Sequence, residues 1–570
     1  MQNFKKLVAE KVLEAIKCSF ANVTITENEL AEMLEYPPDT TMGDIALPCF
    51  KLSRTLRRSP VQIAQFISDN LKDEAIKRVE AVNGYLNISI SDAYLAKVLN
   101  SDILANGDRY GSADLGKGKT VVLDYSSPNV AKPFHIGHLG TTVIGHSLKK
   151  LHEFVGYDCV GINYLGDWGT QFGKMIVAYK KWGDREEINA GGIDKLVELY
   201  VKFHHAAEED PSLNDEARAE FRKLELNDEE NISLWKWFIE ISVAEYKKTY
   251  GQLGIEFDSY KGESFYTDKM PAQVQKLRDM NLLKIDDGAS IVDLEEYNMP
   301  PCLILKRDGS TLYPTRDIAA AVYRKQTYDF DKAIYVTSAG QSLHFAQWFK
   351  VVELMGYDWH DKLVHVPYGT VSINGAKLAT RTGNVILLKD LFAQAIEKVA
   401  EIMDEKNPNL ENKEKVAEAV GVGAIVFYYL SSNRIRDINF VLEDALSFDG
   451  NTGPYVQYTY ARTCSLLERA EDVKLNGDIV FTSDDERELV KTLARFPEKV
   501  LEALEAYEPS IVTRYILDVA TAFNRFYHNC QILSASNESV LNTRIELTKA
   551  ANYVLGNAFD LICLKKTKKI

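Results

Sequence analysis

The sequence predicts a multidomain α/β protein: an α+β N-terminal module, a central parallel sheet with insertions, and an all-α C-terminal domain. The chain has 570 residues, which is more than one hydrophobic core usually holds. Strand, loop, helix and strand patterns follow one another in residues 121–166, as in the first part of a βαβ unit. After about residue 390 the strand patterns fade and helical patterns dominate.

The N-terminal module is expected to span residues 1–112. Apolar residues recur at helical spacing in residues 1–20 and 56–72. A following stretch alternates apolar and polar residues around Asn83-Gly84, a dipeptide that favours a tight turn between two strands. Helices and a hairpin in one module indicate an α+β fold.

The central domain is expected to span residues 113–390. Its first strand, residues 121–127, is short, β-branched and apolar, which indicates a strand buried on both faces. Residues 195–250 are charged with helical spacing, and they predict a helical insertion. Further strands are predicted at residues 159–166, 332–341 and 362–371.

Residues 391–570 are predicted to form a helical domain, as in AFNRFYHNCQIL and ANYVLGNAFDLICL. The segment LKKTKKI, residues 564–570, is a candidate basic patch, although an ordinary solvated terminus explains it equally well. The formal net charge of −15 by itself argues weakly against a nucleic-acid partner, because phosphate binding needs clustered Lys and Arg. A local basic face on an acidic protein is compatible with that charge.

The composition excludes several classes of protein. No run approaches the roughly 18 apolar residues of a membrane span, and the first twenty residues are amphipathic rather than signal-like. We therefore expect a cytoplasmic protein with no membrane partner. The seven cysteines are scattered without a CxxC pair, so neither a disulfide framework nor a zinc site is predicted. We expect no protein-bound metal cluster.

The segment PNVAKPFHIGH, residues 128–138, is the strongest candidate for chemistry. His135 and His138 lie three residues apart where a loop enters a helix, so they share one face of its first turn. The unpaired N–H groups of a helix start attract anions, and Gly137 lets a phosphate or a base approach the backbone. Two structural histidines would explain the pattern too, but Lys132 just upstream favours a phosphate site.

The string HIGH at residues 135–138 matches the HIGH motif of class I aminoacyl-tRNA synthetases, and SSPNVAKPFHIGHLG resembles the arginyl-tRNA synthetases in particular. The resemblance implies a Rossmann-like catalytic domain whose two histidines stabilise the phosphates of ATP. The string YLGDWGTQFG, residues 164–173, resembles a wall of that family's active site, although an ordinary turn is the alternative. The ATP-binding residues implied are His135, Gly137, His138, Gly166 and Asp167.

An arginine substrate needs a planar carboxylate partner, because the N–H fork of its guanidinium pairs with two oxygens. Tyr313 and Asp317 are four residues apart, and the resemblance assigns the arginine side chain to them. Asp317 alone would fit a helix N-cap equally well. The resemblance assigns the α-amino group of arginine to Asn129 and Gln341. Asp124 belongs to the same site but stands where relatives carry Glu, so its shorter arm reaches less far.

The KMSKS loop of the family is altered here to Lys377-Leu-Ala-Thr-Arg381. Attack of a carboxylate on the α-phosphate of ATP brings two anions together, so cations are needed. The resemblance implies that Lys132 supplies the missing charge, and the catalytic set is then His135, His138, Lys132, Lys377 and Arg381. The string LGIEFDSYKGESFY, residues 253–266, also resembles the family, but its residues suggest no chemistry, and packing explains it as well.

Two regions resemble the tRNA-binding parts of the family. Residues 443–470 resemble its helical anticodon-binding domain, and residues 1–112 resemble the module that binds the tRNA elbow. Exposed aromatic and Arg side chains can stack on bases or pair with phosphates, although aromatics at helical spacing are more often core. The candidates for tRNA binding are Tyr455, Tyr458, Arg462 and Asn87, and Gln457 is read as exposed in the same way.

The resemblance implies an arginine–tRNA ligase. ATP with Mg²⁺ would activate L-arginine to arginyl-adenylate, and tRNA(Arg) would accept the arginyl group at its 3′ end. The family is mostly monomeric, so we expect a monomer. A cysteine-specific class I enzyme is disfavoured because its pocket would need zinc ligands that the sequence lacks. The alternative that stays open is a catalytically inactive, synthetase-like RNA-binding protein, against which the retained His135, His138, Lys377 and Asp317 argue.

Overall fold

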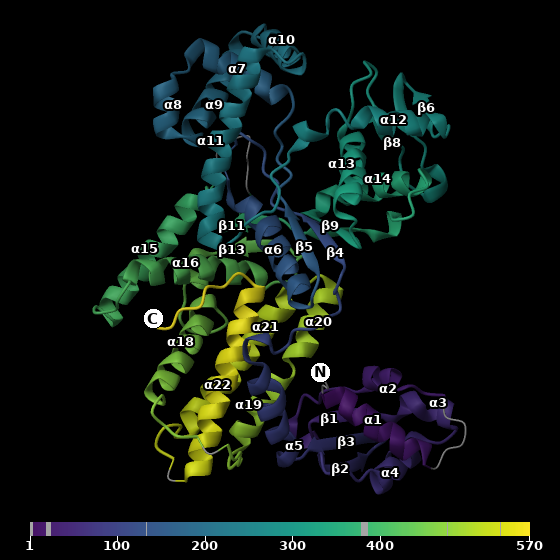
Figure 1. Ribbon diagram of the computed structural model, residues 1–570, viewed down its shortest axis with the longest axis vertical. Helices are drawn as coiled ribbons and strands as arrows, with labels where there is room; N and C mark the ends of the chain where they lie inside the picture. Colours follow the sequence, from purple (N-terminus) through teal and green to yellow (C-terminus); the bar gives the residue numbers. More distant parts are fainter. Residues whose placement is uncertain (1–3, 19–23, 133, 378–385, 476, 536) are drawn as a thin grey trace.

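The computed structural model describes residues 4–18, 24–132, 134–377, 386–475, 477–535 and 537–570. Figure 1 shows a central sheet from which two lobes extend on one side and a helical domain on the other. The N-terminal module, in purple, lies beside the helical domain. This arrangement confirms the predicted multidomain α/β fold.

The N-terminal module consists of one antiparallel sheet and its helices: α1 (Phe4–Lys17), α2 (Glu27–Met33), β1 (Ile45–Pro48), α3 (Ser53–Leu56), α4 (Pro60–Asn70), β2 (Ile76–Val82), β3 (Tyr85–Ile90) and α5 (Asp92–Lys97). The strand order is β1-β3-β2, and α4 packs on β2 and β3. The hairpin turns at Asn83 and Gly84, whose φ angles of 51° and 83° suit the primed turns of β-hairpins. The expected turn is confirmed.

The central sheet consists of β4 (Thr120–Asp124), β5 (Asp158–Ile162), β9 (Lys332–Ser338) and β10 (Leu363–Tyr368), with the crossover helices α6 (Leu139–Phe154) and α14 (Ser342–Leu354). All strands are parallel, in the order β10-β9-β4-β5. The chain winds from β4 to one side and from β9 to the other. In open parallel sheets, ligands bind at the carboxyl ends of the strands where the winding reverses.

Between β5 and β9 the chain forms two lobes, of which only the first is the expected helical insertion (Figure 1). The helical lobe contains α7 (Thr170–Trp182), α8 (Arg185–Gly191), α9 (Ile193–Glu209), α10 (Leu213–Glu225) and α11 (Glu229–Leu253). The second contains α12 (Met270–Asp279), β6 (Leu283–Asp286), β7 (Ala289–Val292), β8 (Cys302–Leu305) and α13 (Tyr313–Tyr328). Its antiparallel sheet β6-β7-β8 escapes sequence reasoning because β6 is short and mostly exposed, which leaves no clear apolar alternation.

The chain after the central sheet is helical, with α15 (Leu388–Lys406), α16 (Lys413–Leu430), α17 (Leu442–Ala445), α18 (Gly453–Arg469), α19 (Asp484–Ala494), α20 (Phe496–Ala506), α21 (Ser510–Asn529) and α22 (Glu538–Leu561). One small sheet interrupts this pattern: β11 (Val371–Ile373), β12 (Ala376–Lys377) and β13 (Ile438–Phe440), in the order β12-β11-β13. The helical prediction is thus confirmed, with β13 as the exception.

Helix α6 joins the sheet to the helical domain. Its residues are buried on almost every side, so it is packed from both directions. The Ser147 hydroxyl donates a hydrogen bond to the carbonyl oxygen of Leu561, at the end of α22, at 2.6 Å. Gly145 permits close packing with the loop after β4, because a Cβ there would lie 2.2 Å from the Tyr125 side chain. The helix that starts at the two histidines therefore has little freedom to move.

Two findings concern the described part of the chain as a whole. None of its helices is long and apolar enough to cross a membrane. Within the same residues, no group of three or more His, Cys, Asp or Glu side chains is placed to hold a metal ion. The seven cysteines are free thiols, of which Cys49, Cys302 and Cys530 are buried.

Candidate functional site

Most of the predicted site residues lie at the carboxyl ends of the central strands. Asp124 ends β4, and the loop that follows it carries Asn129. Gly166 follows β5, and Gln341 follows β9. A bridge between the backbones of Asn129 and Gly166 joins two of these loops. The fold therefore gathers these residues where an open parallel sheet binds its ligands.

The loop between β4 and α6 has a strained backbone. Ser126, Ser127 and Ala131 have positive φ angles of 70°, 48° and 60°, a conformation that costs roughly 1–2 kcal/mol for a residue with a Cβ. Buried hydrogen bonds offset this cost. The Ser126 hydroxyl lies 2.7 Å from the Tyr250 hydroxyl and 2.8 Å from the Thr142 hydroxyl. The loop is therefore held in this shape by hydrogen bonds within the protein.

Helix α11 supports the same loop from the insertion. The Tyr246 hydroxyl lies 2.8 Å from the carbonyl oxygens of both Asn129 and Lys132. The Ala131 N–H donates a hydrogen bond to the Ser242 hydroxyl at 3.1 Å. The backbone is thus fixed while the side chains of Asn129 and Lys132 are exposed. The Lys132 cation is available to an anionic ligand beside the histidines.

The two histidines are arranged as neutral hydrogen-bond donors. His135 Nδ1 accepts from the Gly137 N–H at 3.1 Å, and His138 Nδ1 accepts from the His135 N–H at 3.2 Å. Each neutral ring must therefore carry its proton on Nε2, where it can donate. Burial and the charge of Lys132 lower the pKa of His135 to about 4, and burial and His135 lower the pKa of His138 to about 3. With ring centroids 3.9 Å apart, the pair offers two uncharged donors at neutral pH.

Gly166 and Asp167 make different contacts. Gly166 admits the side chain of Asn129, because a Cβ there would lie 2.2 Å from Asn129 Oδ1. Asp167 is buried, and its two carboxylate oxygens accept from the Ser264 N–H and hydroxyl, each at 2.7 Å. Gly262 leaves room for this carboxylate, since a Cβ there would lie 2.4 Å from Asp167 Cγ. Asp167 thus clamps the string at residues 253–266, and its contact with ATP stays a prediction.

Helix α13 carries the two residues predicted to hold the arginine side chain. It begins at Tyr313, so Asp317 lies inside the helix, and the N-cap alternative for Asp317 is wrong. Asp317 Oδ2 lies 2.6 Å from His344 Nε2, while Oδ1 accepts no hydrogen bond from the described residues. Tyr313 is 67% exposed at the start of the helix. One carboxylate oxygen is therefore oriented by the protein and the other is left for a ligand.

Asp124 faces the protein interior. Its Oδ2 forms a buried ion pair with Arg324 of α13 at 2.8 Å, and its Oδ1 accepts from the Ser127 hydroxyl at 2.9 Å. The Arg324 guanidinium lies 5.1, 5.9 and 5.6 Å from the ring centroids of Tyr164, Tyr266 and Tyr335. Both oxygens of Asp124 are thus occupied. Asp124 thus holds Arg324, and its contact with arginine stays a prediction.

Two side chains beside Asp317 escape sequence reasoning. His344 orients its carboxylate, and Glu263 forms an ion pair with Arg316, the residue before Asp317. Burial raises the pKa of Glu263 to about 7, because it outweighs the attraction of the Arg316 charge. The string at residues 253–266 thus supplies an acidic side chain next to the start of α13. Sequence spacing could not reveal it, because the contact joins residues 53 positions apart.

The altered KMSKS loop is described only at its start. The backbone of Lys377 belongs to β12, where it pairs with Ser372 of β11. Residues 378–385, with Thr380 and Arg381, lie outside the described residues, as does the side chain of Lys377. The roles of Lys377 and Arg381 therefore stay predictions.

The candidate tRNA-binding residues of α18 differ in exposure. Tyr458 is 44% exposed, and the Arg462 guanidinium lies 5.1 Å from its ring centroid. The Tyr455 hydroxyl accepts from Asn524 Nδ2 at 2.9 Å, and Arg462 also contacts Asn524. Gln457 is fully buried and donates to two backbone carbonyls, so its reading as an exposed residue is wrong. Contact of Tyr455, Tyr458 and Arg462 with RNA stays a prediction.

Asn87 and the basic segment at residues 564–570 are the two remaining candidates for contact with tRNA. Asn87 is half-buried in β3, where it pairs with neighbours on both sides. In the segment at residues 564–570, Lys565 and Lys569 form ion pairs with Glu418 and Glu468. The acids reduce the charge that this candidate basic patch presents.

Three family profiles match the chain in succession. The profile described as "tRNA synthetases class I (R), catalytic domain" matches residues 100–442. "Arginyl tRNA synthetase N terminal domain" matches residues 3–90, and "DALR anticodon binding domain" matches residues 456–570.

Similarity also extends over whole chains. The chain is 50% identical to the arginine–tRNA ligase of Alkaliphilus metalliredigens and 48% identical to that of Clostridium perfringens, with 100% of each chain covered. Among solved structures it matches the arginyl-tRNA synthetases of Thermus thermophilus, with a TM-score of 0.82, and Plasmodium falciparum, with 0.81. These two structures are 23% and 24% identical to the chain, and both chains are fully covered, so these matches show the fold alone.

Proposed function

The chain belongs to the arginyl-tRNA synthetase family, and on that premise we propose that it is an arginine–tRNA ligase that works through the residues gathered at the carboxyl ends of β4, β5 and β9. The observation that carries the residue assignment is the Asp317 carboxylate, oriented by His344 on one oxygen and available on the other. A planar acid in this state fits a guanidinium. The comparisons give no support to the inactive alternative.

In the first step a carboxylate oxygen of arginine attacks the α-phosphorus of ATP, and pyrophosphate leaves. His135 and His138 would donate from Nε2 to phosphate oxygens. Each neutral ring already carries its proton on Nε2, so it can donate without first changing its protonation state. Lys132, Lys377 and Arg381 would neutralise the charge that builds on the departing pyrophosphate. Mg²⁺ would enter with the ATP phosphates, because it binds few protein groups and keeps much of its water.

Arginine would lie with its guanidinium at Asp317 and under the exposed ring of Tyr313. Glu263 adds a second acidic group to this end of the site. Asn129 and Gln341, both exposed at strand ends, would hold the α-amino group. Asp124 would act through Arg324, by fixing the helix that carries Asp317.

In the second step a hydroxyl of the 3′-terminal ribose of tRNA(Arg) attacks the arginyl carbonyl, and AMP leaves. We assign the tRNA elbow to residues 1–112, catalysis to 113–390 and the anticodon to 391–570. Tyr455, Tyr458, Arg462 and Asn87 are the proposed RNA contacts. We further propose that the enzyme acts as a monomer in the cytoplasm.

Exchange of radioactive pyrophosphate into ATP tests the proposal. The purified chain should catalyse exchange with arginine in the presence of tRNA(Arg), and with none of the other amino acids. Exchange with a different amino acid would refute the assigned specificity. A chain that binds tRNA(Arg) but shows no exchange at all would instead be the inactive alternative.

A further inference from the structure

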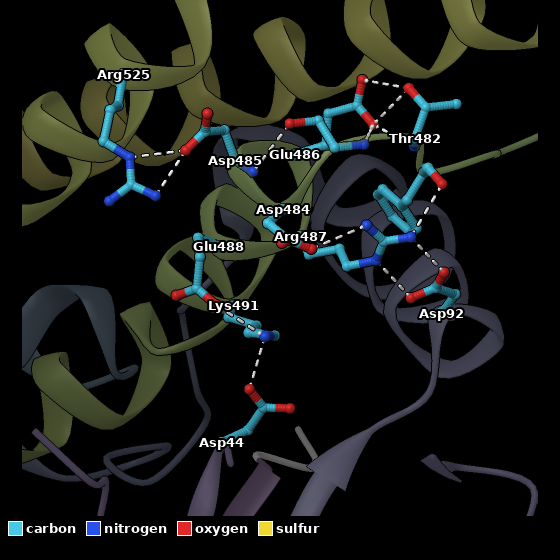
Figure 2. A network of polar contacts seen from close by, with 12 residues as sticks. Asp44, Asp92, Thr482, Asp484, Asp485, Glu486, Arg487, Glu488, Lys491 and Arg525 are labelled. Carbon is cyan, nitrogen blue, oxygen red and sulfur yellow. Dashed lines mark hydrogen bonds and ion pairs between the residues drawn. The ribbon is translucent and has the colours of Figure 1, made fainter. Parts of the chain in front are cut away.

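Charged side chains of one helix, α19, form two of the ion pairs that attach the N-terminal module to the helical domain (Figure 2). Lys5 and Tyr36 of the module also contact Glu498 of α20. Acidic residues fill the first turn of α19, and basic residues follow. Arg487 and Lys491 are four residues apart, so they share one face of the helix. Both form ion pairs with the N-terminal module.

Arg487 holds Asp92, the first residue of α5, by two parallel hydrogen bonds. Its Nε donates to Oδ1 and its second terminal nitrogen donates to Oδ2, both at 2.8 Å. The same nitrogen donates to the Phe481 carbonyl at 3.1 Å, which fixes the guanidinium in its plane. The bond to Arg487 lowers the pKa of Asp92. A bidentate pair of this kind sets direction as well as distance.

Lys491 makes the second attachment, to Asp44. The ion pair measures 2.6 Å, and both side chains are largely shielded from water. The other oxygen of Asp44 accepts a hydrogen bond from the Ile90 N–H at 2.7 Å, so this ion pair is linked directly to the end of β3. These two ion pairs, one to α5 and one to the sheet, add to the contacts at Glu498 and resist rotation of the module more than a single pair could.

The acidic residues of α19 attach the same helix to the rest of the helical domain. Asp485 pairs with Arg525 of α21 at 2.6 Å, and Glu486 pairs with Arg544 of α22 at 2.7 Å. Figure 2 shows the contacts of Asp485, Arg487 and Lys491 with their partners leaving α19 in different directions. α19 thus contacts both the N-terminal module and the rest of the helical domain.

We propose that Arg487 and Lys491 are positioning residues for tRNA: they hold the N-terminal module at the orientation in which it and the α18 surface bind one tRNA molecule at the same time. This inference rests on the proposed function, which assigns tRNA contacts to both parts. Two linked contacts gain affinity from each other only where their spacing lets both form together. The site for arginine and ATP lies at the central sheet and does not depend on this spacing.

The test compares a double variant, Arg487→Gln with Lys491→Gln, with the matched control Arg525→Gln. The control removes an Arg–Asp pair of the same helix that stays within the helical domain. In the double variant the KM for tRNA(Arg) should rise about tenfold, because the second contact loses its effective concentration. The KM values for arginine and ATP at saturating tRNA should stay within about twofold. Asp92→Asn, on the other side of the interface, should reproduce part of the rise.

An isolated anticodon stem-loop provides the second readout, because it touches the helical domain alone. Its Kd should be the same for the parent chain and the double variant. An unchanged KM for tRNA, an equal rise in the Arg525→Gln control, or a weakened stem-loop would each overturn the inference. Absence of arginylation by the parent chain would defeat the proposed function instead, so the two failures are distinguishable.

Discussion

The two ends of the site, around His135 and around Asp317, are built from opposite kinds of polar group. Around His135 the protein offers neutral donors on a rigid loop, held by hydroxyl and backbone hydrogen bonds. Around Asp317 it buries charges in pairs, Asp124 with Arg324 and Glu263 with Arg316. The two regions come from different segments of the chain but meet at one edge of the sheet.

On the proposed function, the difference means that each end complements the charge of its ligand. ATP brings its own negative charge, which the neutral N–H donors and the nearby exposed Lys132 would bind. Arginine is a cation, so its end must keep carboxylates ionised although burial disfavours the charged form. The charges of Arg324 and Arg316 oppose the effect of burial on the pKa of Asp124 and on that of Glu263, since a buried charge is tolerated only when it is paired and hydrogen-bonded.

Removing the neutral donors should have the largest effect. His135→Ala and His138→Ala should each lower kcat of pyrophosphate exchange by about 100-fold, the usual loss when a donor to a developing charge is removed. The pH profile sharpens the point. Because the pKa values lie at about 4 and 3, both rings are uncharged throughout pH 6 to 8. A rate that falls as pH rises through 6.5 would show that a charged imidazole is required. His205→Ala, at an exposed site of α9, is the control.

Removing the paired carboxylate should come next. Asp317→Ala should raise the KM for arginine roughly 50-fold, because loss of a charged partner costs about 2 kcal/mol or more, while the KM for ATP changes little. Pyrophosphate exchange with each substrate varied in turn measures both. Asp308→Ala, in the same stretch but exposed, should be nearly silent. Equal changes in both KM values would defeat the division of the site into two ends.

The cations of the ATP end should matter less than its neutral donors. Lys132→Ala should slow adenylate formation about tenfold, as severely as Lys377→Ala, because both charges would oppose the same developing negative charge. Single-turnover kinetics measure this step directly. A nearly silent Lys132 change beside a damaging Lys377 change would show that Lys132 does not compensate for the altered loop.

The smallest expected effect is a pH dependence confined to the arginine end. Burial raises the pKa of Glu263 to about 7, above its ordinary value, so this group is protonated below pH 7 and ionised above it. As pH rises from 6 to 8 the site gains negative charge, and the KM for arginine should fall about threefold. In Glu263→Gln the KM should be independent of pH over this range. A slope that persists in the variant would assign the titration to another group.

The sequence by itself determined the parts that are local. Residues 124–132 form a strand end and a loop, and residues 134–138 lead into a helix, so the spacing of His135 and His138 is enough to predict that they act together. The four parallel strands follow from apolar runs a few residues long, each bounded by turns. The Asn83-Gly84 turn needs only two residues with positive φ. Such features are determined within short windows, because backbone sterics and hydrophobic periodicity act over a few residues.

Only the tertiary structure decided which charges meet. Asp124 turns to Arg324, Asp317 to His344 and Glu263 to Arg316, although the partners are far apart in sequence. The partner of a buried carboxylate depends on how α13 packs against the string at residues 253–266 and the strand ends. In that low-dielectric setting pairing energies are large and depend on position. The same reason separates Gln457, which packing buries, from Tyr458, its exposed neighbour on α18.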